Sequence, residues 1–299
     1  MKAPPPQPRS AGRRRSGDKR RSRQVPVTET PHPGGAVDRL PSTRLVVERL
    51  HAGDREAVAA VGRAVPSIAS LAELAAERLG RGGRLVYVGA GTSGRLGALD
   101  AVECPPTFGV APSRVLALVA GGPRALRRAV EGAEDDRAAG AAAAARLGPD
   151  DLVVGISASG RTPFVLSALA AARRRGAATA LVTSNPAARA PVDARVVLET
   201  GPERIAGSTR MKAGTAAKMA LGLLSSAAFV RLGTVQAGRM VALRPSSEKL
   251  RRRAVRTVAE LSGIGAAAAR RLLSASGWDV RRALDAARRG ERRTGRERR

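Results

Sequence analysis

Apolar and polar residues follow two different patterns along this chain of 299 residues. From residue 38 to residue 83, apolar positions recur every three or four residues, a spacing that predicts two or three amphipathic helices ending at the stretch GRGG. Short runs of aliphatic and β-branched residues follow and predict strands. The predicted strands are 84–90, 113–122, 150–163 (which runs into a serine-rich turn), 178–186 and 194–200.

Helix-like segments separate most of these strands, which predicts an α/β fold with a parallel sheet covered on both faces. After Thr215 the pattern becomes helical, and the end of the chain predicts a small helical bundle. Its expected core is Leu261, Ile264, Leu272, Leu273, Trp278, Val280 and Leu284. We therefore predict four parts, namely a disordered basic tail (1–35), an α/β domain (36–250), a helical domain (251–290) and a second basic tail (291–299).

Composition adds two constraints. Hydrophobic residues make up 43% of the chain but aromatic residues only 2%, so the core must be built from Ala, Val and Leu. The net charge of +28 suggests a polyanion partner, but much of it lies near the two ends of the chain. We interpret these ends as solvated arms. Non-specific nucleic-acid contact by them would depend on salt and is not predicted as the function.

Few residues are available for cysteine, histidine or membrane chemistry. The single Cys104 excludes an intramolecular disulfide and fits a reducing compartment. His32 and His51 are the only histidines, which argues against a Ser-His-Asp triad and against a histidine-rich metal site, and no metal is predicted. The longest apolar stretch, MALGLLSSAAFV, is too short to span a bilayer. We expect a cytoplasmic protein without a membrane partner.

The first predicted strand leads into GAGTSGR, whose Gly89, Gly91 and Gly94 match the spacing G-x-G-x-x-G. In a dinucleotide-binding fold, an acidic residue should end the next strand and hold the ribose. That strand instead ends in LVAGG, without a carboxylate. The glycine motif therefore does not indicate a nicotinamide cofactor.

A second loop, SASGRT, follows the third predicted strand and also places hydroxyl groups beside glycine. Strand-to-helix turns of this kind point backbone N–H groups at an anion, and two of them on neighbouring parallel strands would meet at one sheet edge. This pattern predicts a site for a phosphomonoester such as a sugar phosphate, although the serines and the threonine could simply cap helices. The predicted ligands are Gly91, Thr92, Ser93, Ser157, Ser159, Gly160 and Thr162.

The loop S-x-S-G-x-T after a parallel strand resembles the SIS phosphosugar-binding domain. Within that superfamily, YVGAGTSGRLGALDAVECPPTFGV, VEGAEDD, GISASGRTP and GSTRMKAGTAAKM resemble the N-acetylmuramic acid 6-phosphate etherases. The match covers about residues 38 to 290, with the motifs in the family's order. It implies a three-layer SIS domain with N-terminal helices and a small C-terminal helical bundle. The family's N-terminal segment is only loosely visible, so substrate contacts there stay open.

The resemblance implies a carbon–oxygen lyase that cleaves the D-lactyl ether of N-acetylmuramic acid 6-phosphate. The products would be N-acetylglucosamine 6-phosphate and D-lactate, in the recycling of cell-wall amino sugars, and the family needs no cofactor. Its catalytic acids map onto Glu103 and Glu134. In the ring-opened sugar, a base can remove the C2 proton, which lies beside the aldehyde, while an acid protonates the departing lactate. The resemblance suggests Glu103 as this acid and Glu134 as the C2 base.

Each of these residues also has a simpler interpretation. Glu103 could end a helix before two prolines, and Glu134 could belong to a solvated acidic turn. Cys104 has no histidine nearby in sequence to activate it, which favours a packed thiol. The cations Lys212 and Arg210 could screen phosphate charge or be structural, with Lys212 the preferred ligand. Lower-ranked carboxylates are Glu203 and Asp100.

The spacing within the first motif predicts an oligomer. One continuous helix from Thr92 to Glu103 would separate its ends by roughly 16 Å, which is longer than a sugar phosphate. Either the helix breaks near Gly97 or Glu103 serves a phosphate held by another subunit, and we predict the second, a homodimer with shared sites. Two functions of other classes stay open: a non-catalytic sugar-phosphate sensor, and a DNA-binding regulator, for which no helix-turn-helix is evident.

Overall fold

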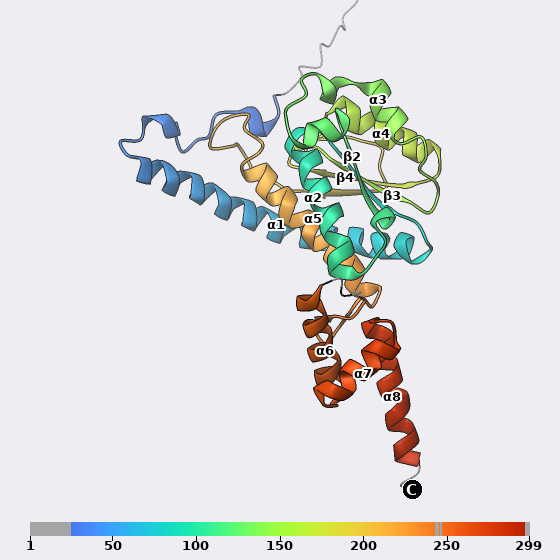
Figure 1. Ribbon diagram of the computed structural model, residues 1–299. Helices are drawn as coiled ribbons and strands as arrows, with labels where there is room; N and C mark the ends of the chain where they lie inside the picture. Colours follow the sequence, from blue (N-terminus) through green and yellow to red (C-terminus); the bar gives the residue numbers. More distant parts are fainter. Residues whose placement is uncertain (1–24, 243–244, 246, 297–299) are drawn as a thin grey trace, which may run out of the picture.

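The computed structural model describes residues 25–242, 245 and 247–296. The predicted tail residues 1–24 and 297–299 lie outside this range. A five-stranded sheet forms the centre, in the order β2-β1-β3-β4-β5, and all its strands are parallel (Figure 1). The strands are β1 (Leu85–Gly89), β2 (Val115–Val119), β3 (Leu152–Ile156), β4 (Ala178–Thr183) and β5 (Ala194–Val197). The predicted α/β fold with a parallel sheet is confirmed.

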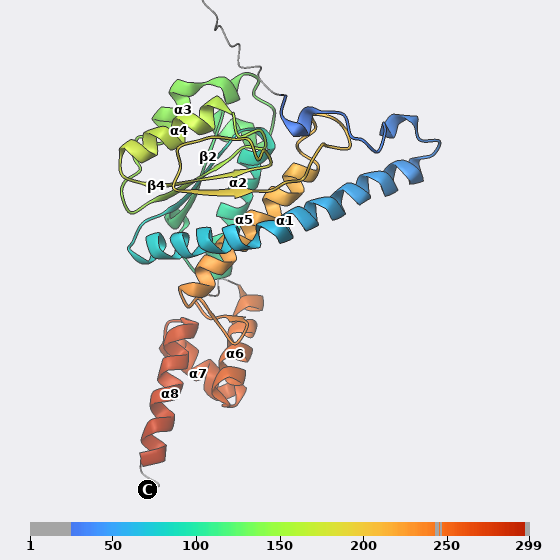
Figure 2. The same cartoon turned by 180° about the vertical axis from the view of Figure 1, so that it is seen from behind.

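Two layers of helices cover the sheet, as the two opposite views show (Figure 1, Figure 2). Alternation along β1 divides the core, because neighbouring side chains of a strand point to opposite faces. Leu85 and Tyr87 pack against one helix layer, and Val86 and Val88 against the other. The first layer contains α1 (Thr43–Gly80), α2 (Gly91–Phe108) and α5 (Lys212–Arg231), and the second contains α3 (Arg137–Ala143) and α4 (Pro163–Arg174).

Short elements complete the described part of the chain. Five 3-10 helices lie in the connections: η1 (Val27–Glu29), η2 (Val37–Arg39), η3 (Pro112–Arg114), η4 (Gly122–Leu126) and η5 (Ala133–Asp135). A two-stranded antiparallel hairpin, β6 (Val235–Gln236) with β7 (Arg239–Met240), follows α5.

One helix of 38 residues, α1, replaces the two or three helices predicted before the sheet. It starts at the N-cap Ser42 and runs through Pro66, which lies on its exposed side. An interior proline costs about 3 kcal/mol in an isolated helix. Here the buried stripe continues on both sides of it, including Val61 and Ile68, so packing against the sheet and α5 outweighs the local penalty.

Residues 25–35, which the sequence pattern placed in the disordered tail, are held against the fold. Thr28 is buried, and its carbonyl accepts a hydrogen bond from the Gly207 N–H (2.9 Å). The Arg49 guanidinium donates to the Gly34 carbonyl (2.7 Å). Contacts with residues far along the chain order this segment, and its own composition could not reveal them.

The C-terminal bundle consists of α6 (Glu248–Ser262), α7 (Ala266–Ala275) and α8 (Val280–Arg296), drawn in brown to red in Figure 1. All seven predicted core residues belong to its apolar cluster, with Leu273, Val280 and Leu284 fully buried. The predicted limits differ in detail. The boundary between residues 250 and 251 falls in the first turn of α6, and α8 continues to Arg296, into the predicted second tail.

Helices α1 and α5 are long and apolar enough, by length and composition alone, to cross a membrane. However, α5 packs against α1 and the sheet, and both helices contribute buried side chains to the same apolar cluster. A buried core helix passes the same test, and their packing explains their apolar character here.

Candidate active site

The loop between β1 and α2 has the geometry of an anion cradle. Gly91 has a φ of +52°, and no atom lies within 4 Å of the position that a Cβ would take. Gly94 packs so closely on the end of β1 that an added Cβ would lie 2.7 Å from the Gly89 carbonyl oxygen. No side chain caps α2, so its first N–H groups, including those of Thr92 and Ser93, point out of the helix end.

The loop between β3 and α4 is tied by its own hydroxyl groups. The buried Ser157 Oγ accepts a hydrogen bond from the Gly160 N–H (3.0 Å) and shares one with the Thr162 Oγ1 (2.8 Å). Ser159 Oγ accepts from the Arg161 N–H (3.2 Å). The alternative in which these residues simply cap the helix does not hold for α4, because its N-cap Thr162 makes no side-chain capping bond. The N-terminus of α4 therefore also lacks a side-chain cap.

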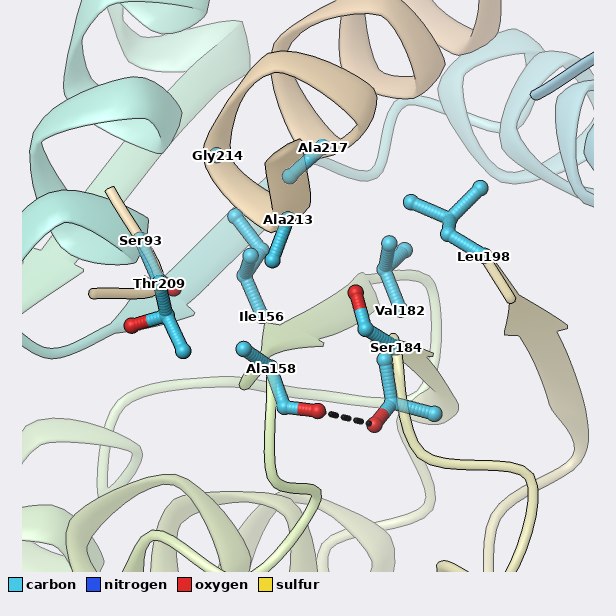
Figure 3. A pocket seen from close by; sticks show the side chains of 11 residues that line it. Ser93, Ile156, Ala158, Val182, Ser184, Leu198, Thr209, Ala213, Gly214 and Ala217 are labelled. Atoms are coloured by element: carbon cyan, nitrogen blue, oxygen red, sulfur yellow. Dashed lines mark hydrogen bonds between the residues drawn. The ribbon is translucent and has the colours of Figure 1, made fainter. Parts of the chain in front are cut away.

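The two loops are neighbours because β1 pairs with β3, and Gly89 lies opposite Ile156 at the end of the ladder. A pit of ≈ 10 Å³, about one water molecule in size, lies beside them between the sheet edge and α5 (Figure 3). Its polar lining includes Ser93, Ser184 and Thr209 (Figure 3). A space of this size cannot enclose a molecule much larger than water.

Sequence reasoning did not select Ser184 and Thr209 as site residues. Ser184 follows β4 in the sequence TSNP, and Thr209 precedes α5 in GSTR, so both repeat the pattern of hydroxyl groups near the sheet edge. Ser184 could have been predicted from a simpler signal, a hydroxyl-bearing residue directly after a strand, without the requirement of a neighbouring glycine.

The two predicted catalytic carboxylates lie on different elements. Glu134 is exposed on η5, in the connection that follows β2, and the neighbouring Asp136 caps α3 by accepting from the Ala139 N–H (2.8 Å). Glu103 is exposed near the C-terminal end of α2. Within the described residues, neither carboxylate has a hydrogen-bond or ion-pair partner. The exposure of Glu134 is what the solvated-turn interpretation predicts, and its catalytic role stays a prediction.

Helix α2 is continuous through both prolines of the motif, so it neither breaks near Gly97 nor ends at Glu103. It ends one turn later, where Gly109 has a φ of +67° and its N–H donates to the Pro105 carbonyl (2.9 Å). Pro105 and Pro106 each lack an N–H donor, so two upstream carbonyls of α2 lose their helical partners. The loop between β1 and α2 consequently lies at the N-terminal end of α2, and Glu103 lies near its C-terminal end.

Lys212 does not line the pit. Its side chain is buried and forms an ion pair with Glu56 of α1, and Arg204 pairs with the same carboxylate. Burial alone would raise the pKa of Glu56, but the two cations outweigh it and lower that pKa. Burial, followed by the charges of Arg204 and Lys212, lowers the pKa of the neighbouring His32. Lys212 can reach a phosphate only if this cluster opens.

The buried Glu203 has a capping role. Its carboxylate accepts the N–H groups of Lys212 (3.0 Å) and Ala213 (2.9 Å), the first residues of α5. Burial raises the pKa of Glu203, although these two hydrogen bonds oppose the effect. A protein carboxylate thus fills the N-terminus of α5, in contrast to the uncapped ends of α2 and α4. The exposed Arg210 lies outside this cluster.

Cys104 is a packed thiol in the core. It is buried, and burial followed by the charge of Asp100 raises its pKa to about 12. A thiol with that pKa is not a nucleophile near neutral pH. Within the described residues, no group of three or more His, Cys, Asp or Glu side chains could hold a metal ion.

Two protein-family models match parts of this chain. Residues 67–173 match the glucokinase regulatory protein N-terminal SIS domain, and residues 129–227 match the SIS domain. The N-acetylmuramic acid 6-phosphate etherase of Symbiobacterium thermophilum is 52% identical over 246 residues, which cover 81% of this chain and 82% of that protein. The etherase of the same description from Deinococcus radiodurans is 50% identical over 262 residues, covering 86% of each chain.

Solved structures of low identity are also similar. E. coli CFT073 c3406 in complex with A5P is 17% identical, with a TM-score of 0.48, and the match covers 67% of this chain and 97% of that one.

Proposed function

This chain belongs to the N-acetylmuramic acid 6-phosphate etherase family, and we propose that it cleaves the D-lactyl ether of N-acetylmuramic acid 6-phosphate. Identity of 52% over most of both chains carries this proposal. The two neighbouring loops, each followed by a helix without a side-chain cap, support it, because they suit the 6-phosphate. The products are N-acetylglucosamine 6-phosphate and D-lactate, which places the enzyme in the recycling of cell-wall amino sugars.

The reaction proceeds by elimination and then hydration, which makes the enzyme a carbon–oxygen lyase. In the ring-opened sugar, the Glu134 carboxylate removes the C2 proton, a double bond forms between C2 and C3, and the C3–O bond breaks. Glu103 gives its proton to the departing lactate oxygen. Water then adds, with the hydroxyl at C3 and the proton at C2. Both carboxylates are exposed, which supports this assignment because each side chain is open to a substrate.

The two active sites are shared within a homodimer. On α2, the exposed residues Leu99, Val102, Glu103 and Pro106 follow the spacing i, i+3, i+4, i+7 and therefore lie on one face. Leu99 is 45% exposed and Val102 66%, an apolar surface that surrounds Glu103 and suits contact with another subunit. The length of α2 supports a position of Glu103 beside a phosphate bound by the partner subunit in this proposed dimer. The lone buried Cys104 is compatible with a cytoplasmic location.

Incubation with N-acetylmuramic acid 6-phosphate in deuterated water tests the reaction. Release of D-lactate, with deuterium at C2 of the product, is the expected result. The match of residues 67–173 to the SIS domain of a regulatory protein favours one competing function, a non-catalytic sugar-phosphate sensor. Binding of the substrate with neither lactate release nor C2 exchange would establish the sensor instead.

Mixed dimers test the shared site. Glu103→Gln and Glu134→Gln subunits, each inactive alone, are mixed under conditions that allow exchange of subunits. If Glu103 acts across the dimer and Glu134 within its own subunit, one site of each mixed dimer is intact, and about a quarter of the wild-type activity returns. Absence of any recovery, with mixed dimers demonstrated by mass spectrometry, would place both carboxylates in the same subunit.

A further inference from the structure

A buried polar cluster joins α2 to β1 and α5, next to the predicted catalytic acid. The Tyr87 hydroxyl of β1 donates to Asp100 Oδ2 (2.7 Å), and the Ser225 hydroxyl of α5 donates to Asp100 Oδ1 (3.1 Å). The Cys104 thiol lies 3.9 Å from Asp100 Oδ2. Tyr87, Ser225 and Cys104 are almost completely buried. One carboxylate of α2 is thus bound from two sides, by a strand and by a helix.

This arrangement is a costly way to hold a helix. In the part of the chain that the structure describes, the hydrogen-bond partners of Asp100 are neutral hydroxyls and a thiol, so no cation compensates its charge at contact distance. Burial raises the pKa of Asp100, although the hydrogen bonds from Tyr87 and Ser225 oppose the effect. Apolar side chains of similar volume would stabilise such an interface at least as well. What the carboxylate adds is direction, because hydrogen bonds depend on angle.

Elsewhere along α2, directional side-chain contacts lie near its N-terminal end, where the Arg95 guanidinium donates to the carbonyls of Ala125 (2.8 Å) and Arg128 (3.2 Å). The face of α2 toward the sheet carries Gly94, Gly97 and Ala101, and a Cβ at Gly97 would lie 2.8 Å from the Tyr87 Cβ. Such small residues allow close approach but do not interlock. At the end of the helix, Phe108 stacks on a phenylalanine of α5 with 4.7 Å between ring centroids, a contact that permits sliding. Asp100 therefore supplies the directional contacts of α2 that lie closest to Glu103, one turn away along the helix.

We propose that Asp100 is a positioning residue, which fixes the rotation of α2 and thereby the direction in which Glu103 points. A side chain ends about 5–6 Å from the helix axis, so a rotation of roughly 10° moves it by about 1 Å. A misplacement of 1 Å can cost up to about 100-fold in rate. Backbone N–H groups at the N-terminal end lie within about 2.3 Å of the axis and move by less than half as much. This inference rests on the proposed function of Glu103.

Hydroxyl deletions test the proposal with little risk to folding. In Tyr87→Phe and in Ser225→Ala we expect kcat for lactate release to fall about 10-fold, while KM stays within about twofold. Exchange of the C2 proton, which depends on Glu134 of η5, should also stay within about twofold. The matched control is Thr234→Val, which removes another buried hydroxyl bond, to the Phe229 carbonyl (2.8 Å), beyond the C-terminal end of α5. It should match the wild type.

Substitution of the carboxylate gives the larger effect. We expect Asp100→Leu to lower lactate release about 100-fold, and Asp100→Asn, which keeps one acceptor oxygen, to recover about 10-fold of that loss. If Asp100 acts through Glu103, adding Asp100→Leu to Glu103→Gln leaves the C2 exchange that Glu103→Gln retains unchanged within about twofold. A fall in C2 exchange equal to the fall in lactate release, in the single or the double variant, would show a general structural role and overturn the proposal.

Two further outcomes are decisive. Rates in Tyr87→Phe and Ser225→Ala equal to those of Thr234→Val would overturn the positioning role, even if Asp100→Leu fails to fold. A wild-type protein that neither exchanges C2 nor releases lactate would refute the proposed function itself, before any variant is compared. The failure of one proposal is therefore distinguishable from the failure of the other.

Discussion

Substitution of Gly160 by alanine probes the phosphate loop most directly. Gly160 has a φ of +66°, a left-handed conformation that costs a residue with a Cβ about 1–2 kcal/mol. The added Cβ would lie 2.4 Å from the Ala188 Cβ and 3.0 Å from Thr183 Oγ1. Ordinary carbon contacts are about 3.5–4.0 Å. The loop must therefore move by about 1 Å, at a further cost of about 1–3 kcal/mol.

That displacement should weaken both substrate binding and turnover. The Gly160 N–H bonds Ser157 Oγ, so movement of Gly160 also moves the hydroxyl groups that are proposed to bind phosphate. We expect kcat/KM for lactate release to fall about 10- to 100-fold. Coupled detection of D-lactate over a range of substrate concentrations measures this, and urea unfolding measures the loss of stability.

Gly176→Ala supplies the control for Gly160→Ala. Gly176 also has a left-handed φ, +82°, but its Cβ would meet only Pro149, at 3.4 Å, just beyond the C-terminal end of α4. It carries the same conformational cost of about 1–2 kcal/mol without the clash. Its kcat/KM should stay close to that of the wild type. Equal kcat/KM values for the two variants would refute the reasoning that the loop geometry determines phosphate binding.

Four other expectations follow from the same contacts. Glu103→Gln should abolish lactate release yet keep C2 exchange, whereas Glu134→Gln should lose both. NMR detection of deuterium at C2 measures the exchange, and the reverse pattern would show that the two carboxylates have the opposite roles. Glu203→Ala should lower the free energy of unfolding by about 3 kcal/mol in urea, because it leaves two N–H groups of α5 without an acceptor. A decrease below about 1 kcal/mol would contradict the capping role of Glu203. The lowered pKa of His32 makes its contribution to stability complete above about pH 6.5 and lost as the pH falls toward that lowered pKa. The amide protection factors of residues 25–35, which correct for the slower intrinsic exchange at lower pH, should therefore fall in that range, and unchanged protection factors would refute it. Cys104, with a pKa of about 12, should resist thiol reagents at pH 7.5 until urea unfolds the chain, and rapid labelling of the native protein would contradict its burial.

Much of the fold was predictable from local patterns. Each of the five predicted strands contains an observed strand, since short β-branched runs followed by glycine carry their own structural preference. The loops of Gly91 and Gly160 were predictable for the same reason, as both glycines have a positive φ. The neighbouring positions of the two loops, expected from alternating strands and helices, are confirmed by the pairing of β1 with β3.

The predicted helix limits were wrong where tertiary packing outweighs the local conformational preference of the chain. Two or three helices were predicted before the sheet, but the buried stripe of α1 continues as one helix past Pro66. The apolar surface around Glu103 emerges only when α2 is seen as one straight helix with an exposed face.

The sequence alone therefore determined the class of fold and the two glycine and hydroxyl loops, because each depends on residues close together in the chain. The two candidate carboxylates came from the resemblance to the etherase family. Tertiary structure alone decided the partners of Lys212, Glu203 and Asp100. The ion pair between Lys212 and Glu56 joins residues 156 positions apart, and the bond from Ser225 to Asp100 joins residues 125 apart. A buried charge without a partner raises the free energy of the folded state by more than local conformational preferences can offset. Its partner can therefore come from a distant part of the chain. Lys212 was predicted as a phosphate ligand, which stays a prediction, and its ion pair with Glu56 could not be read from the sequence.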